Sequence, residues 1–228
     1  MNYLLESLSS SLAMLLHLNT DVLNAVRVSL ETSAASIILA ALFGIPLGAI
    51  IGLARFRGRR LVLTLLNTLM ALPTVVIGLF LFGLFSRQGP LGPLGLLFTP
   101  WAMIVGQMVL ATPIIANYTL ATIAGADPRI LPTALTLGAS PAQGIWQLLL
   151  ELRFGMMAAI IAGFGRVIAE VGVAMMLGGN IRGTTRTMTT AIALETSKGE
   201  FAFGLALGMV LMSIALVINL FLNLMQQR

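Results

Sequence analysis

Long apolar runs alternate with short polar or arginine-containing stretches along the chain. Several of these runs reach the roughly 20 residues that an α-helix needs to cross the hydrocarbon of a bilayer. They predict five membrane-spanning helices, at about residues 26–53, 61–85, 101–124, 154–177 and 201–224. Pro46, Pro73 and Pro113 lie inside the first three runs. Because proline removes a backbone hydrogen bond, we expect bends there and a break in the second span near Pro73.

The first residues follow a different pattern. Residues 4–22 are only weakly apolar, and Leu4, Leu5, Leu8 and Leu12 follow helical spacing with serines between them. This pattern predicts a short interfacial or periplasmic helix. A further span is the alternative.

Composition supports a membrane protein. The chain is 58% hydrophobic and 9% charged, whereas a soluble domain carries about 25% charged residues. We therefore expect an all-α integral membrane protein, with residues 1–228 forming a single transmembrane domain. Most basic residues stand at the ends of the predicted spans, which favours a lipid bilayer as partner and argues against nucleic acid.

Arginines beside short loops indicate the orientation, because basic residues are retained in the cytoplasm. Arg55, Arg57, Arg59 and Arg60 cluster between the first two spans. With this loop inside, seven basic residues lie on the cytoplasmic side and five on the other. We expect a multi-pass protein of the cell (inner) membrane with its N-terminus outside and its C-terminus in the cytoplasm.

Catalytic chemistry is not indicated. Lys198 lacks the glycine-rich run of a phosphate-binding loop, there is no cysteine, and His17 is the one histidine. We therefore expect no catalytic, metal or cofactor site. If ATP drives this protein, another chain hydrolyses it.

Residues 127–153 form a polar interlude between two spans. Asp127 and Pro128 suit a helix start, Gly138 suits a helix end with positive φ, and Ser140 suits a second start. The pattern predicts two short helices joined by a hinge. A folded hairpin of this kind offers a surface to a partner outside the bilayer.

This stretch resembles the EAA loop of ABC-importer permeases, which reads Glu-Ala-Ala, three residues, Gly, nine residues and then Ile-x-Leu-Pro. The spacing of Ala134 and Gly138 matches, whereas Pro132, Thr133 and Glu151 depart from the pattern. The resemblance implies a type I ABC-importer permease fold with five core transmembrane helices and a cytoplasmic coupling helix pair. It assigns contact with a cytoplasmic ATP-binding subunit to Ala134, Gly138, Ala139 and Ser140.

Two charged residues lie inside the fourth predicted span. Arg166 and Glu170 are four positions apart, so they share one helix face and can pair. Charges inside a membrane are costly and normally face the interior of a bundle. The pair is either structural, a contact between two copies of the chain, or part of the transport pathway or its gate.

Residues 178–196 are rich in hydrogen-bond donors. Glycines expose backbone N–H groups, arginines supply forked donors and threonines supply hydroxyls. Such a surface suits a tetrahedral oxyanion, although an ordinary solvated loop is an equal alternative. The candidate substrate path comprises Asn180, Arg182, Thr185 and Arg186.

From Glu170 to Thr196 the sequence, including GGNIRGTTRTMTTAIALET, is similar to the permeases of tungstate ABC importers and more loosely to those of molybdate importers. The resemblance implies a homodimer with two ATPases and an external substrate-binding protein, importing an oxyanion by alternating access. Tungstate is the expected oxyanion. The alternatives are a molybdate or sulfate importer permease, a stand-alone secondary carrier, or a structural membrane protein.

Overall fold

The computed structural model describes residues 2–17, 19–54 and 56–226, and all regular elements in these ranges are helical. Arg55 and Arg228, which contribute to the charge comparison above, lie outside them. The elements are α1 (Asn2–Leu16), α2 (Thr20–Leu53), α3 (Arg59–Ala71), α4 (Thr74–Phe85), η1 (Gly92–Leu94), α5 (Pro100–Ala124), α6 (Ile130–Thr136), α7 (Pro141–Glu151), α8 (Arg153–Ile168), α9 (Gly172–Gly178), α10 (Met188–Lys198) and α11 (Phe201–Gln226). The all-α prediction is confirmed.

Three helices, α2, α5 and α11, are long and apolar enough to cross a membrane within the described residues. The bent pairs α3–α4, with an angle of 94°, and α7–α8, with an angle of 70°, raise the number to as many as five. Helices dominate because hydrocarbon offers no partner to a backbone N–H or C=O, so each segment must satisfy its own. The break predicted near Pro73 is confirmed, since α3 ends at Ala71 and α4 begins at Thr74.

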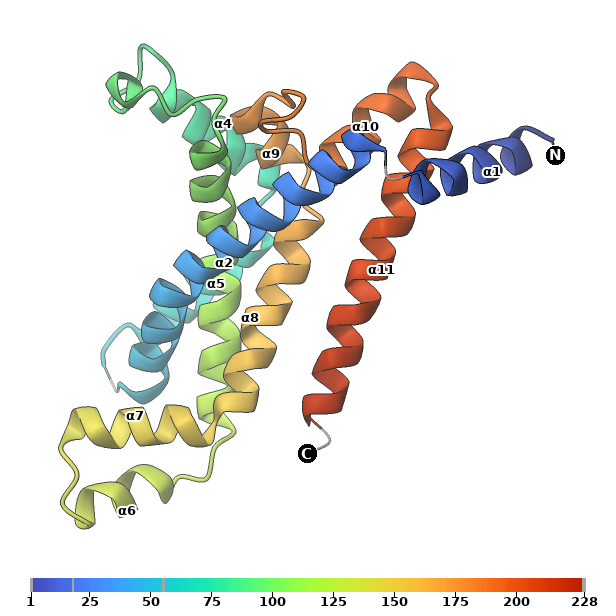
Figure 1. Ribbon diagram of the computed structural model, residues 1–228. Helices are drawn as coiled ribbons and strands as arrows, with labels where there is room; N and C mark the ends of the chain where they lie inside the picture. The colour runs from blue at the N-terminus through green and yellow to red at the C-terminus, as the bar shows by residue number, and fades with distance from the viewer. Residues whose placement is uncertain (1, 18, 55, 227–228) are drawn as a thin grey trace.

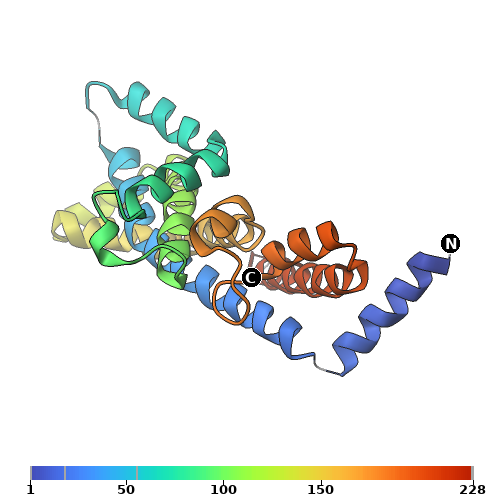
Figure 2. The ribbon, with the colours of Figure 1, turned by 90° about the horizontal axis from the view of Figure 1, so that it is seen from above.

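The centre of the bundle is the crossing of α2 and α5. Three glycines of α2 face α5 at this crossing: Gly44, Gly48 and Gly52. The residues of α5 opposite them are Ile115, Ala116, Thr119 and Ile123. A Cβ on Gly48 would lie 2.3 Å from the Ala116 carbonyl oxygen. The two backbones therefore approach as closely as small residues allow. In the view from above, α5, α8 and α9 lie between α2 and the α3–α4 pair (Figure 2).

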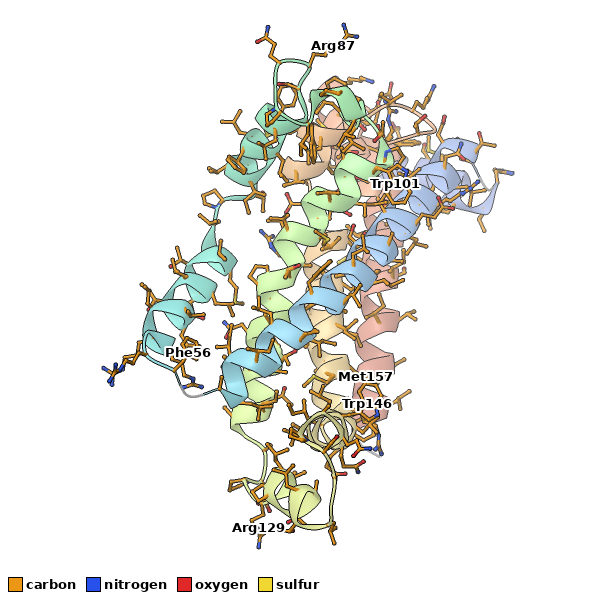
Figure 3. The ribbon with its side chains drawn as sticks, turned by 90° about the vertical axis from the view of Figure 1, so that its left-hand side faces the viewer. Phe56, Arg87, Trp101, Arg129, Trp146 and Met157 are labelled. Carbon is orange, nitrogen blue, oxygen red and sulfur yellow. The ribbon has the colours of Figure 1, made fainter. Side chains whose placement is uncertain are left out.

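The two ends of the bundle carry different parts of the chain. Figure 1 shows α6, α7 and the C-terminus at one end, and the N-terminus, α9 and α10 at the other. Trp101 lies near the second end and Trp146 near the first (Figure 3), and both are 63% exposed. Because tryptophan favours the boundary between lipid headgroups and acyl chains, we expect the two membrane boundaries near these rings.

The N-terminal stretch differs in detail from the prediction. Residues 4–22 do not form one helix: α1 ends at Leu16, and α2 begins at Thr20 rather than near residue 26. Asn19 causes the earlier start, because its side chain accepts a hydrogen bond of 2.9 Å from the Asp21 amide. Ser7 and Ser11 are buried and Leu12 is exposed. Serines, being small, form the packed face of α1, which lies against α11.

The fourth predicted span, residues 154–177, is interrupted. Helix α8 ends at Ile168 and α9 begins at Gly172. Glu170 fills the break: its carboxylate accepts from the Val173 amide at 3.2 Å, and its carbonyl accepts from the Thr189 hydroxyl at 2.7 Å. The prediction of one continuous helix was wrong because hydropathy does not reveal a break whose polar groups are satisfied by the chain itself.

Gly48→Ala tests the α2–α5 crossing. We expect it to lower the free energy of unfolding by about 1–3 kcal/mol, because a backbone carbonyl must move to admit the methyl group. The melting temperature in detergent measures the effect. Gly83→Ala on α4 is the control, since a Cβ at Gly83 would meet no neighbouring atom within 4 Å. Equal melting temperatures for the two variants would contradict the tight crossing.

Candidate functional site

The coupling hairpin, residues 127–153, ends its first helix through a backbone motif centred on Gly138. Gly138 has φ +90°. Its amide donates to the Leu135 carbonyl and the Ala139 amide donates to the Ala134 carbonyl, both at 3.1 Å. These are the two bonds of a Schellman motif, which satisfies the last carbonyls of a helix. The separation of Ala134 and Gly138 therefore follows from helix-end geometry, and the predicted positive φ is confirmed.

The second helix of the hairpin begins with a capping box. The Gln143 amide donates to the Ser140 hydroxyl at 3.3 Å, and the Ser140 amide donates to the Gln143 side chain at 2.8 Å. Both bonds satisfy donors that helix α7 leaves unpaired at its start. The predicted cap at Ser140 is confirmed.

The predicted start of the first helix at Asp127 was wrong. Helix α6 begins at Ile130. Asp127 instead accepts hydrogen bonds from the Arg129 amide at 2.9 Å and from the Arg129 guanidinium at 2.8 Å. These bonds hold the pKa of the Asp127 carboxyl below its usual range. The aspartate thus stabilises a turn before the helix, because aspartate side chains also readily accept hydrogen bonds from the backbone two residues later.

Packing joins the two helices of the hairpin and attaches them to the bundle. A Cβ on Gly144 would lie 2.9 Å from a methyl group of Leu131, so α6 rests directly on α7. Leu148, one turn further along, is buried with Ile123 and Ala49 at the ends of α5 and α2. Gly144 was not predicted as a contact residue, although its spacing of four from Leu148 places it on the same buried face.

At the tip of the hairpin an apolar side chain is exposed. Leu137, next to Gly138, is 82% exposed. The figure labels Arg129 at this extreme end of the molecule (Figure 3). A hairpin that is capped at both helix ends and bears an exposed leucine is a rigid surface on which another protein can dock.

On the opposite end of the bundle, residues 178–187 form a closed loop. Thr185 is fully buried; its hydroxyl donates to the Gly178 carbonyl at 2.5 Å and accepts from the Ile181 amide at 3.0 Å. Asn180 has φ 52° and its side-chain oxygen accepts from the Thr190 hydroxyl at 2.9 Å. Thr185 therefore holds the loop together from within, and Asn180 ties the loop to Thr190 at the start of α10.

The loop also carries the two predicted arginines, and each is paired. Arg182 forms an ion pair of 2.8 Å with Asp21 at the start of α2. Arg186 forms one of 3.3 Å with Glu195, which Lys198 also contacts. The Arg186 Nε is buried and has no hydrogen-bond partner in the described part of the chain. Asp21 was missed as a partner because it is 161 positions away.

Arg166 and Glu170 form an ion pair, as their spacing predicted. Arg166 and Glu170 approach to 3.8 Å, from the last turn of α8 and the break that follows it. Their environments differ, since the glutamate side chain is 3% exposed and the arginine side chain 46%. The ion pair therefore lies between neighbouring residues at the end of α8, away from the coupling hairpin at the start of that helix.

Comparison with known proteins gives the family. Residues 44–228 match the binding-protein-dependent transport system inner membrane component family. This chain belongs to that family. It is accordingly a multi-pass inner-membrane permease subunit and not an enzyme.

Several relatives match this permease over most of their length. The tungstate uptake system permease protein of Campylobacter jejuni is 39% identical over 219 residues, which cover 96% of this chain and 92% of that protein. The protein of the same name from Peptoclostridium acidaminophilum is 35% identical and covers 100% of both. The molybdenum transport system permease protein of Mycobacterium tuberculosis is 31% identical, over 86% of this chain and 76% of that protein.

A solved structure confirms the fold. A chain of the methionine ABC transporter in an inward-facing conformation superposes on this permease with a TM-score of 0.73, at 18% identity, and covers 90% of this chain and 94% of that chain. The predicted type I ABC-importer permease fold is thus confirmed.

Gly138→Val tests the hairpin. A β-branched residue in the left-handed region costs about 1–2 kcal/mol, so we expect faster amide hydrogen exchange at residues 134–143. Nothing lies within 4 Å of a Cβ at this position, so the cost is conformational and not steric. Gly138→Asn is the control, because asparagine tolerates positive φ. Identical exchange in both variants would contradict the role of the Schellman motif.

Proposed function

We propose that this chain is the permease of an ATP-driven importer whose substrate is a tetrahedral oxyanion, tungstate in the first place. The observation that carries the proposal is the similarity, over nearly the whole chain, to two tungstate uptake permeases. The arginines of residues 178–187 would supply the donors that such an anion requires.

The proposal includes three protein partners. A cytoplasmic ATP-binding subunit would dock on the coupling hairpin through Ala134, Gly138, Ala139 and Ser140. An external substrate-binding protein would deliver the anion to the opposite end, and a second copy of this chain would complete the pathway. The N-terminus would lie outside and the C-terminus in the cytoplasm, because the hairpin and the C-terminus share one end (Figure 1).

Alternating access would follow from movement of the hairpin. ATP would draw the two ATP-binding subunits together, and each would pull its hairpin along. Leu152 alone separates α7 from α8, so displacement of α7 would tilt α8 directly. ATP and substrate can shift the equilibrium between inward-open and outward-open states only by binding them with different affinities.

The four predicted path residues would take two different roles. Arg182 and Arg186 would offer donors to the anion at the outer end, since part of each guanidinium is not engaged by its carboxylate partner. Asn180 and Thr185 would keep the loop in the conformation that presents these arginines.

A molybdate permease is the second candidate, favoured by the relative from Mycobacterium tuberculosis, and a sulfate permease is the third. All three anions are tetrahedral, so selectivity would lie mainly in the external binding protein. A stand-alone secondary carrier would transport without an ATP-binding subunit.

Reconstitution tests the function. We expect proteoliposomes that contain this chain, its ATP-binding subunit and its binding protein to accumulate tungstate only with ATP, and this chain alone to transport nothing under an ion gradient. Competition by molybdate and sulfate ranks the three anions. Gradient-driven uptake by the chain alone would identify a secondary carrier instead.

Arg182→Gln and Arg186→Gln test the outer residues. We expect each to lower the rate of tungstate uptake several-fold, because a charge-assisted donor is lost. Arg87→Gln is the matched control, since Arg87 is an arginine at the same end of the molecule, outside the loop of residues 178–187 (Figure 3). If uptake kinetics are unchanged in both test variants, the two arginines do not contact the anion and only form their ion pairs with Asp21 and Glu195.

A further inference from the structure

Arg166 has donors that the protein does not use. It lies 3.8 Å from the Glu170 carboxylate, which is an ion pair but is longer than a hydrogen bond. Within residues 2–17, 19–54 and 56–226 no hydrogen bond from the Arg166 side chain occurs. A guanidinium has five N–H donors. The Arg166 side chain is 46% exposed, so donors without a protein partner remain for a ligand.

The place of Arg166 along α8 puts it at a depth that we assign to the membrane interior. It is the fourteenth residue of α8, a helix that begins beside the coupling hairpin at Arg153. At about 1.5 Å per residue the guanidinium stands roughly 20 Å along the helix, within a hydrocarbon layer of about 30 Å. Gly165 and Ala169 are exposed beside it, whereas Gly163 and Val167 are packed into the bundle. Arg166 therefore lies on the exposed face of α8, together with Gly165 and Ala169.

The carboxylate of the pair is fixed. Glu170 is 3% exposed, and one of its carboxylate oxygens accepts from the Val173 amide at 3.2 Å. Its carbonyl is bound by the Thr189 hydroxyl at 2.7 Å. A Cβ on Gly172 would lie 3.0 Å from the Thr74 hydroxyl and 3.4 Å from the Glu170 carboxylate, so α4 closes the other side. The glutamate cannot follow a ligand, whereas the arginine has room to move.

We propose that Arg166 is a transient binding station for the transported oxyanion within the membrane, and that Glu170 keeps its affinity low. This inference rests on the proposed function. The anion accepts hydrogen bonds from the free guanidinium donors, which are the preferred partners of tetrahedral oxyanions. The fixed carboxylate of Glu170 repels the same anion, and it pairs with Arg166 again once the anion leaves. The charge of Arg166 is thereby never left unpaired in hydrocarbon, where it would be costly.

The rival explanation is that Arg166 only neutralises Glu170. The two explanations differ for the double variant Arg166→Gln/Glu170→Gln, which removes both charges and leaves no buried carboxylate unpaired. A purely structural pair predicts normal uptake by this variant. The proposed station predicts loss of uptake, because the donors to the anion are gone.

The experiment uses the complete importer in proteoliposomes, with tungstate as the probe and uptake and ATP hydrolysis measured together. We expect the double variant to assemble with its ATP-binding subunit but to take up tungstate about tenfold more slowly. A tenfold lower rate is the effect of losing one interaction that stabilises the transition state of the transport step. The matched control is Arg27→Gln/Glu31→Gln, which removes another Arg–Glu pair of the same spacing from α2. This control should transport normally.

Arg166→Lys provides an independent test if the double variant does not assemble. Lysine keeps the ion pair but offers three donors in place of the planar fork, so uptake should fall several-fold. Wild-type rates in the double variant, or in Arg166→Lys, would overturn the station. Absence of tungstate uptake by the wild-type importer would instead refute the proposed function, so the two failures are distinguishable.

Discussion

The contact between α2 and α5 brings two membrane-crossing helices together at a distance that a side chain at Gly48 would not permit. Other parts of the molecule depend on this pair. The ends of both helices hold Leu148 of the coupling hairpin, and Gly163 of α8 packs on Ile115 of α5. In a bilayer, lipid is as apolar as the helix surface, so close backbone packing supplies much of the force that burial supplies in water. A small change at this crossing therefore reaches every element attached to it.

The coupling hairpin is attached to this pair as a rigid body. Its two helix ends are closed by backbone and side-chain hydrogen bonds, at Gly138 and at Ser140. Its helices are in direct contact, because the Leu131 side chain of α6 packs onto Gly144 of α7. A loosely joined hairpin would absorb a pull by deforming. A capped and packed hairpin would instead transmit the movement through Leu152 to α8, the helix that carries Arg166.

The sequence revealed those features whose cause is local. Helix spans follow from the length of apolar runs, and the turn at Gly138 and the cap at Ser140 follow from residue type and spacing. Asp127 shows the limit, because aspartate stabilises a helix start and an isolated turn equally well, and Arg129 decided between them. The break around Glu170 and the pairing of Arg182 with Asp21 depend on residues distant in the chain. Such contacts leave no periodic trace in a single sequence.

Charge is scarce in this chain, and its placement follows two different rules. At the two ends of the bundle, ion pairs such as Arg182–Asp21 are short and partly solvated. Water therefore stabilises each charge and lowers its desolvation cost. At the depth in the membrane that we propose for Arg166, water would not offset the cost of its charge, and the residue lies beside a fixed carboxylate.

If Arg166 binds the anion as proposed, the separation of 3.8 Å from Glu170 would be a compromise between binding the anion and releasing it. A short, bidentate pair would engage the guanidinium completely and leave no donor for an anion. An arginine without a carboxylate would hold a dianion so strongly that release would limit transport. A pathway driven by ATP gains its direction from the conformational cycle and not from affinity within the membrane, so a partly neutralised arginine serves it better than either extreme.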